Sequence, residues 1–266
     1  MIDFHNHVLP DVDDGSKTLE ESISMLRCAH DQGVTDVVQT VHFQHPKMDG
    51  KNIEYNYLLD KVKELQSKIN SEKLNITIHL SAEVFYLPNL IEISKNPLVT
   101  LGNKKYMLIE FLPNIRPIDY ESQFYELQQS GITPIVAHPE RYSFVQKDIN
   151  VLSLWIDRGY VIQIDAGSII GHFGKLTRKI CLDMIGCRYV NLIGSDSHNN
   201  RKRNFCIKEA YDIIENKFGI NYVNMLKKNS QHILKGKDVL EINYDKNNIF
   251  DKIVSFMNKK INKFKD

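Results

Sequence analysis

Short apolar runs alternate with amphipathic segments over most of the chain. The apolar runs have the length of buried strands and occupy residues 1–5, 35–41, 76–82, 106–111, 133–138, 161–165 and 190–194. The segments between most of them have helical periodicity and predict helices at residues 17–32, 52–70, 119–130, 148–159, 174–186 and 203–218. Seven strands, most of them followed by a helix, indicate an α/β fold whose parallel strands close, or nearly close, into a barrel.

The organisation of the chain indicates one large domain. Its 266 residues contain no internal repeat, no low-complexity linker and no boundary rich in Pro and Gly. A barrel of this class routinely reaches this length as one unit. We therefore predict a single domain over residues 1–266, with a helical C-terminal extension from about residue 219.

The last part of this extension is basic. Residues 246–266 contain six Lys against two Asp, and their apolar residues recur at helical spacing. The pattern predicts an amphipathic helix. Such a helix either packs on the barrel or makes a peripheral contact with a membrane-associated kinase or with anionic lipid.

The charge balance argues against a general nucleic-acid binder. The chain has 34 Lys and Arg against 33 Asp and Glu, so its formal net charge of +1 creates no broad field for a phosphate backbone. No apolar run approaches the roughly 18–20 residues that span a bilayer. The N-terminus lacks the basic region and the long apolar stretch of a signal peptide. We expect a cytoplasmic protein without a transmembrane segment.

The cysteine pattern excludes the usual thiol chemistries. No C-x-x-C pair occurs, so neither a zinc knuckle nor a thioredoxin-type redox motif is present. Cys-based phosphatases need an Arg six residues after the nucleophile, and no cysteine of this chain has one. We interpret all four as reduced, structural thiols: Cys28, Cys181, Cys187 and Cys206.

Metal-binding residue types are concentrated at the carboxyl ends of the predicted strands. Six of the seven strands end at or next to a His, Asp or Glu. His5 and His7 are alternate residues of one strand, which face the same way and can bind one metal together. Barrel enzymes build their sites at these ends. The predicted metal-binding set is His5, His7, His42, Glu83, Glu110, His138, Asp196 and His198. The remaining histidines, interpreted as structural or surface residues, are His30, His45, His79, His172 and His232.

The same positions form motifs that resemble a known superfamily. In chain order they are residues 3–7 (DFHNH), 13–15 (DDG), 33–35 (GVT), 40–42 (TVH), 82–83 (AE), 108–111 (LIEF), 137–141 (AHPER), 194–199 (GSDSHN) and 203–205 (RNF). Their combination and order resemble the PHP (polymerase and histidinol phosphatase) superfamily, whose fold is a distorted seven-stranded βα barrel around a two- or three-metal site. Within it, the chain is similar to the capsule-cluster tyrosine phosphatases of the CpsB/CapC type.

The resemblance implies a grouping of the metal ligands. It assigns His5, His7, Glu83 and Asp196 to a first metal, Glu83, Glu110 and His138 to a second, and Asp14, His42 and His198 to a third. Asp13 and Asp14 are adjacent, so the sequence leaves the choice between them open, and we favour Asp14. The family habit favours Mn²⁺, with two or three ions. Nitrogen and carboxylate donors without thiolate suit Fe or Zn as well.

The resemblance also implies a reaction. A metal-bridging hydroxide would attack phosphotyrosine, while Arg141 and Arg203 neutralise the phosphate oxygens. Asp196, His42 or His198 would assist as an acid. The implied substrate is the tyrosine-rich tail of a membrane-associated bacterial autokinase that controls capsule or exopolysaccharide synthesis. The alternatives are another PHP phosphoesterase, such as a histidinol-phosphate phosphatase, and a non-catalytic metal-binding regulator of a kinase.

Overall fold

Seven parallel strands form one sheet in the order of the chain. The computed structural model describes residues 1–48 and 51–240. Its strands pair consecutively from β1 to β7, and every pair is parallel. The strands are β1 (Ile2–Asn6), β2 (Asp36–Phe43), β3 (Thr77–Phe85), β4 (Tyr106–Glu110), β5 (Thr133–Val136), β6 (Val161–Asp165) and β7 (Leu192–Gly194). All seven predicted strands are therefore confirmed, with small shifts at their ends.

The sheet closes into a barrel where β7 returns to β1. Just beyond β7, the Asp196 amide donates to the His5 carbonyl at 2.7 Å, and the His7 amide donates to the Ser197 carbonyl at 2.8 Å. The pairing of β1 with β2 shifts in register between Asp3 and Asn6. The predicted barrel is thus confirmed: it is nearly closed where β7 meets β1, and it is distorted where β1 pairs with β2. The seam also brings two predicted ligand segments together.

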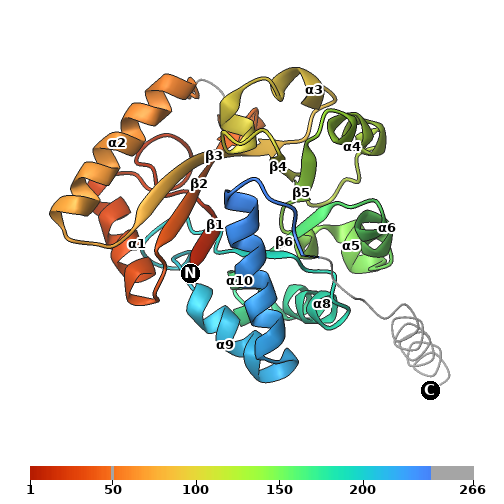
Figure 1. Ribbon diagram of the computed structural model, residues 1–266. Helices are drawn as coiled ribbons and strands as arrows, with labels where there is room; N and C mark the ends of the chain where they lie inside the picture. The colour runs from red at the N-terminus through yellow and green to blue at the C-terminus, as the bar shows by residue number, and fades with distance from the viewer. Residues whose placement is uncertain (49–50, 241–266) are drawn as a thin grey trace.

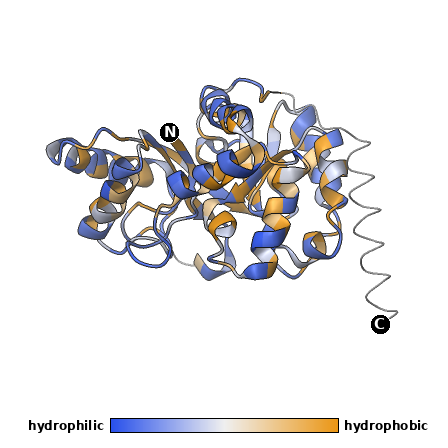
Figure 2. Cartoon of the chain, turned by 90° about the horizontal axis from the view of Figure 1, so that it is seen from below, coloured by the Kyte–Doolittle hydropathy of each residue, from blue (hydrophilic) through white to orange (hydrophobic). Residues whose placement is uncertain are grey.

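The helices surround this barrel (Figure 1). They are α1 (Leu19–Asp31), α2 (Tyr55–Ser71), α3 (Leu90–Ile93), α4 (Tyr120–Gln129), α5 (Ser143–Lys147), α6 (Val151–Asp157), α7 (Ala166–Ile170), α8 (Lys175–Gly186), α9 (Ile207–Phe218) and α10 (Ile220–Leu234). Figure 2 shows hydrophobic and hydrophilic colour alternating along them, as expected for helices with one face on the strands. The helix predicted from residue 203 begins only at Ile207, because Asn199 Oδ1 accepts the Arg201 and Arg203 amides and holds residues 199–203 in a turn.

The barrel interior has its own small core. Phe4, Val38, Leu108 and Ile135 lie in it with other apolar strand residues, and Ile233 of α10 joins them. The larger core lies between the strands and the outer helices. α10 lies across the amino ends of the strands, where Asn103 Nδ2 donates to the Ile233 carbonyl at 3.0 Å and the Tyr106 hydroxyl donates to the Lys237 carbonyl, just after the helix, at 2.8 Å. One end of the barrel is therefore covered by α10, and the carboxyl ends of the strands form the other.

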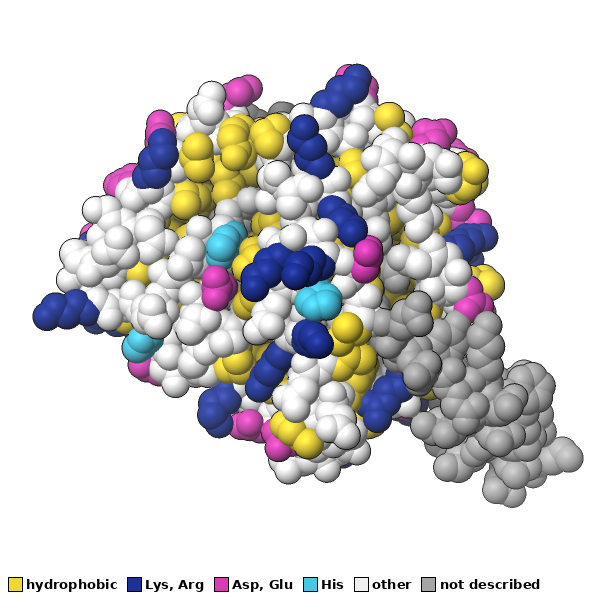
Figure 3. Space-filling view, in the orientation of Figure 1, with side chains coloured by type: hydrophobic (Ala, Val, Ile, Leu, Met, Phe, Trp, Pro, Cys, Tyr) yellow, Lys and Arg dark blue, Asp and Glu magenta, His cyan; other side chains and the backbone are white. Residues whose placement is uncertain are grey.

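The amino-end face carries positive charge. Figure 3 shows Lys and Arg side chains gathering over α10 on this face. Lys104, Lys235 and Lys237 are exposed there, and Lys105 pairs with Asp238 at 2.8 Å. This charge lies at the opposite end from the strand carboxyl ends. The predicted basic helix of residues 246–266 lies outside the described residues. Within the described ranges, no helix combines the length and apolar character needed to cross a membrane.

Candidate metal centre

The predicted ligands converge at the carboxyl end of the barrel. They arrive from the ends of β1, β2, β3 and β4 and from the segments that follow β1, β5 and β7. All are buried except Asp14, whose side chain is 43% exposed. They form four overlapping groups, in each of which the donor atoms lie within 4.8 Å of one another. The groups are His7, Asp14, His42 and His198; His5, His7 and Asp196; His5, Glu83 and His138; and His42, Glu83 and Glu110.

Glu83 lies at the centre of the cluster. Its Oε2 atom lies 3.1 Å from His5 Nε2 and 3.2 Å from His42 Nδ1. The same oxygen lies 3.5 Å from His7 Nε2. Its Oε1 atom accepts from His138 Nε2 at 2.8 Å. One carboxylate thus faces four imidazoles, which is the arrangement expected of a ligand shared between metals.

The two adjacent aspartates have different environments. Asp14 Oδ1 lies 3.3 Å from His42 Nε2 and 3.3 Å from His198 Nε2. Asp13 is buried, with Oδ2 2.8 Å from His7 Nδ1 and Oδ1 accepting the Gly15 amide. Asp13 therefore orients the His7 ring and leaves Nε2 toward the cluster, as carboxylates behind metal-bound imidazoles do. This geometry favours Asp14 as the ligand.

Gln163 of β6 orients a second imidazole. Its Oε1 atom lies 3.1 Å from His5 Nδ1, and the same oxygen accepts the His138 amide at 3.4 Å. Contact at Nδ1 fixes the ring so that His5 Nε2 points toward Glu83. Gln163 is therefore a supporting residue that the sequence analysis missed, because it lies in the middle of a predicted strand.

Several polar atoms of the cluster are buried without a hydrogen-bond partner among the described residues. They are His5 Nε2, His7 Nε2, His42 Nδ1, His138 Nδ1 and Glu110 Oε1. A buried polar atom without a partner costs free energy, so such a set is rare in a protein unless a ligand satisfies it. Nitrogen and carboxylate donors without sulfur are typical of Mn, Fe or Zn sites. The residues present therefore fit a multi-metal centre.

The pKa values show that the cluster requires positive charge. Burial lowers the pKa of His5, but the Glu83 and Asp196 carboxylates together outweigh burial and the pKa rises to about 9. Burial and His7 lower the pKa of His42, yet Asp14 and Glu110 raise it to about 10. Burial would raise the pKa of Glu83, but the surrounding imidazoles hold it well below the usual value. In the metal-free protein, protons on the imidazole nitrogens supply this positive charge. Metal cations compete with those protons for the same nitrogen atoms.

Two of the clustered residues have an unusual backbone conformation. His138 has a φ of 32° and Asp196 a φ of 50°, both in the left-handed region that residues other than glycine rarely adopt. Such conformations cost on the order of 1–3 kcal/mol each and cluster at functional sites. Backbone bonds hold both turns: the Arg141 amide donates to the His138 carbonyl, and the Asp196 amide donates to the His5 carbonyl.

Arg141 and Arg203 lie beside the cluster and share one carboxylate. Arg141 donates to Asp196 Oδ2 at 2.7 Å and to Asp165 Oδ2 at 2.9 Å. Arg203 donates to the same Asp196 oxygen at 2.5 Å. The other oxygen, Asp196 Oδ1, lies 3.6 Å from both His5 Nε2 and His7 Nε2. Asp196 therefore divides its two oxygens between the imidazole cluster and the two arginines.

Two further residues belong to the site and were not predicted. Asp165, the last residue of β6, holds Arg141. A carboxylate at a strand end is the same signal that identified Glu83, so the sequence did contain this clue. His45, which was interpreted as a structural or surface residue, lies at the edge of the cluster, outside the four donor groups. Its Nε2 atom lies 3.7 Å from Glu110 Oε1, and its ring lies 4.8 Å from the ring of His42.

Glycine is required where β7 approaches β1. A Cβ atom on Gly194 would lie 2.3 Å from His5 Cβ and 2.9 Å from the His5 amide nitrogen. The replacement Gly194→Ala should therefore displace His5 and weaken metal binding by about 10–100-fold, the scale seen when ligand support is lost. Titration of Mn²⁺ into each protein measures this.

Gly186→Ala is the matched control for that experiment. Gly186 is the last residue of α8, and its added Cβ would meet only Phe218 Cε1 at 3.4 Å. We expect this variant to bind metal as the unmodified protein does. Equal metal affinity in Gly194→Ala would contradict the close approach described at the seam.

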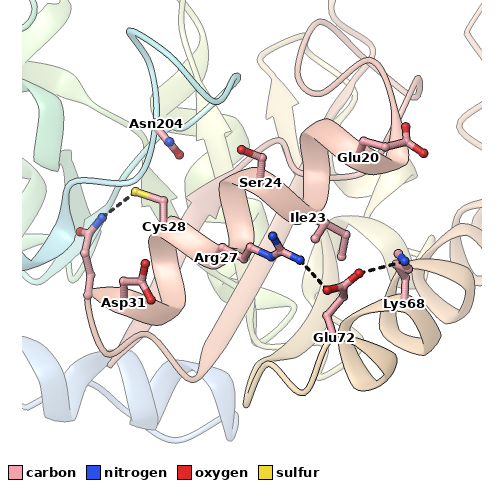
Figure 4. Close-up of a pocket in the computed structure, with 10 residues that line it drawn as sticks. Glu20, Ile23, Ser24, Arg27, Cys28, Asp31, Lys68, Glu72 and Asn204 are labelled. Carbon is pink, nitrogen blue, oxygen red and sulfur yellow. Dashed lines mark hydrogen bonds and ion pairs between the residues drawn. The ribbon is translucent and has the colours of Figure 1, made fainter.

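The cysteines lie away from the clustered residues. Cys28 lines a surface hollow of about 680 Å³ beside α1 (Figure 4), where Gln32 Nε2 donates to its sulfur at 3.2 Å. Arg27 and Lys68 both pair with Glu72 in the same hollow. Burial raises the pKa of the Cys181 and Cys206 thiols, which opposes formation of a thiolate.

Replacing all four cysteines should leave turnover unchanged. Ser at Cys28 and Cys187 and Ala at Cys181 and Cys206 would remove every thiol from the chain. Because none of these residues joins the metal-binding groups, we expect unchanged kcat and metal content in protein that remains folded. The measurement is kcat together with circular dichroism. Loss of turnover in a single folded, metal-loaded Cys variant would show that a thiol takes part in the reaction.

A parallel barrel with a His and carboxylate cluster at its strand ends defines a class of metal-binding barrel proteins. A family model described as "Capsular polysaccharide synthesis, CpsB/CapC" matches residues 1–235. The putative tyrosine-protein phosphatase CapC of Staphylococcus aureus is 36% identical over 217 residues, which cover 80% of this chain and 82% of that protein. The chain therefore belongs to the CpsB/CapC family.

Two further comparisons agree with this assignment. The tyrosine-protein phosphatase YwqE of Bacillus subtilis (strain 168) is 32% identical over 244 residues, covering 90% of this chain and 93% of YwqE. A crystal structure determined in work on YwqE from Bacillus subtilis and CpsB from Streptococcus pneumoniae superposes with a TM-score of 0.87 at 30% identity. It covers 92% of this chain and 98% of that one, and those proteins are described as unique metal-dependent tyrosine phosphatases.

Proposed function

We propose that this protein is a metal-dependent tyrosine-protein phosphatase. The observation that carries the proposal is the juxtaposition of two arginines with the His and carboxylate cluster, through the shared carboxylate of Asp196. Such a site combines cation-binding donors with fork-shaped donors that match phosphate. CapC is described as a putative tyrosine-protein phosphatase and YwqE as a tyrosine-protein phosphatase, and the matches cover 82% and 93% of those proteins.

The clustered residues would hold two or three Mn²⁺ ions, with Fe or Zn as alternatives. The proposed ligands are His5, His7, Asp14, His42, Glu83, Glu110, His138, Asp196 and His198. Divalent cations bound there would supply Lewis acidity, which acidifies water and offsets the charge of a phosphoryl group. This chemistry needs no cysteine nucleophile.

The protein's own residues have three tasks in this proposal. Arg141 and Arg203 bind the phosphate oxygens and keep them oriented, because their planar guanidinium groups are fixed by Asp165 and Asp196. Asp13 and Gln163 hold the imidazoles in place. Asp196, His42 or His198 would assist by protonating the leaving oxygen. A tyrosine oxygen needs little help, since its pKa is about 10.

We further propose that the substrate is a phosphotyrosine tail of a membrane-associated bacterial autokinase and that the reaction takes place in the cytoplasm. The family description, capsular polysaccharide synthesis, supports a role in capsule or exopolysaccharide production. No disulfide is formed among the described cysteines, which is consistent with a reducing compartment. The candidate site lies at the barrel end that α10 leaves uncovered, which gives a flexible peptide tail a route to the arginines.

Rates on three substrates test the proposed function. Purified, Mn²⁺-loaded protein should hydrolyse phosphotyrosine faster than phosphoserine or histidinol phosphate, and chelation should stop the reaction. Faster hydrolysis of histidinol phosphate would instead make this chain a different phosphoesterase. Full metal loading without turnover of any of the three would favour a non-catalytic regulator.

A further inference from the structure

The loop between α7 and α8 reaches the two arginines. It consists of Gly171, His172, Phe173 and Gly174, and it follows β6 at the carboxyl end of the barrel. Gly171 has a φ of 103° and Gly174 a φ of 92°, so both ends of the loop adopt conformations that favour glycine. The His172 amide donates to the Gly167 carbonyl at 2.8 Å. The loop thereby places the Phe173 ring beside Arg141 and Arg203.

Phe173 contacts both guanidinium groups with its aromatic ring. The Arg141 Cζ atom lies 4.8 Å from the ring centroid, and the Arg203 Cζ atom lies 5.9 Å from it. Both distances are within the range of cation–π attraction. The residue below the ring is Gly167, where a Cβ atom would lie 3.1 Å from Phe173 Cε2. The absence of a side chain at Gly167 makes room for this aromatic ring.

The ring is not used to build the interior of the protein. Phe173 is only half-buried, and it belongs to neither hydrophobic core of the described chain. It therefore places an apolar surface beside two cations and a carboxylate. Arg203 Nε is buried and has no hydrogen-bond partner among the described residues. An anion that accepts from this N–H group would lie close to the ring.

We propose that Phe173 forms the aromatic wall of a subsite for the leaving group of an aryl phosphate. The inference rests on the proposed phosphatase function. In an aryl phosphate one ester oxygen joins the ring to phosphorus, so a phosphate held by Arg141 and Arg203 must place its ring near them. Among the described residues, Phe173 is the aromatic residue that contacts both arginines. Offset or edge-to-face contact between the two rings selects aryl over alkyl phosphates.

The binding of two phosphonates distinguishes a contact between the ligand and the Phe173 ring from a contact between the phosphonate group and the two arginines. Benzylphosphonate has the shape of a phenyl phosphate and cannot be hydrolysed, and methylphosphonate has no ring. Titration calorimetry with Mn²⁺-loaded protein should give a lower Kd for benzylphosphonate. In Phe173→Leu this preference should fall by about two- to twelvefold, the range that corresponds to about 0.5–1.5 kcal/mol for an aromatic pair. The Kd for methylphosphonate should stay the same.

Phe173→Tyr is the matched control, because it retains the ring. It should keep the preference for benzylphosphonate. Equal weakening of both phosphonates in Phe173→Leu would overturn the proposal, since Phe173 would then only position the arginines. An unchanged preference in Phe173→Leu, or no binding of either phosphonate to the unmodified protein, would overturn it as well. Failure of the proposed function gives a different result: the ring-dependent preference persists while phosphotyrosine is not hydrolysed.

Discussion

Glu83→Gln should lose metal and activity together. The replacement keeps the size of the side chain and removes its charge. Glu83 Oε2 lies within 3.5 Å of three imidazole nitrogens, and Oε1 accepts from a fourth imidazole. Two of the four donor groups contain this carboxylate. We expect kcat/KM on phosphotyrosine to fall by about a thousandfold or more, because about 4 kcal/mol of charge stabilisation corresponds to that factor.

Metal content and kcat/KM on the same preparation test this expectation. Glu126→Gln is the control, since Glu126 is an exposed residue of α4 outside the cluster. It should behave like the unmodified protein. If Glu83→Gln folded normally and retained its full metal content, Glu83 would not be the shared ligand. If circular dichroism showed that Glu83→Gln does not fold, metal titration of Glu83→Asp would take the place of this test.

The arginine variants should separate phosphate binding from metal binding. Arg141→Ala and Arg203→Ala should each retain the full metal content, because both side chains contact Asp196 Oδ2 and leave Oδ1 for the cluster. Each should lower kcat/KM by roughly 10²–10³, the scale of losing one preorganised donor to a reacting oxyanion. Lys replacements should restore only part of the rate, since an ammonium group has no planar fork.

Arg158→Ala is the control for these variants. Arg158 pairs with Glu121 at 2.9 Å on the outer surface, so its removal should leave both metal content and rate unchanged. The assigned phosphate contact would be wrong if Arg141→Ala or Arg203→Ala kept the rate of the unmodified protein. It would also be wrong if either variant lost metal.

Much of this site could be predicted from the sequence, because a parallel barrel brings the carboxyl ends of all its strands to one end. Residues at the carboxyl ends of strands meet at one end of the barrel, however far apart they are along the chain. His5, Glu83 and His138 illustrate this: they come from different parts of the sequence and share one donor group. Residue types at the strand ends therefore predicted eight of the nine clustered residues, and the resemblance to the family added Asp14.

The remaining features depend on orientation, which residue type and spacing do not determine. Asp13 and Asp14 have the same chemistry and differ in burial and in which imidazole each one faces. His45 reaches Glu110 because the chain turns after β2, where Gln44 has a φ of 50°. No motif marks the loop residue Phe173 in the sequence, and only the fold brings its ring against the two guanidinium groups. Turn geometry and side-chain direction decided these three cases.

The central claim is that catalysis depends on the metal centre held by these residues. The most direct measurement removes metal by chelation and restores Mn²⁺ stepwise, with metal content and phosphotyrosine turnover determined on each sample. We predict no turnover in the stripped protein and recovery in proportion to the metal bound. Full turnover in protein shown to contain no metal would contradict the account.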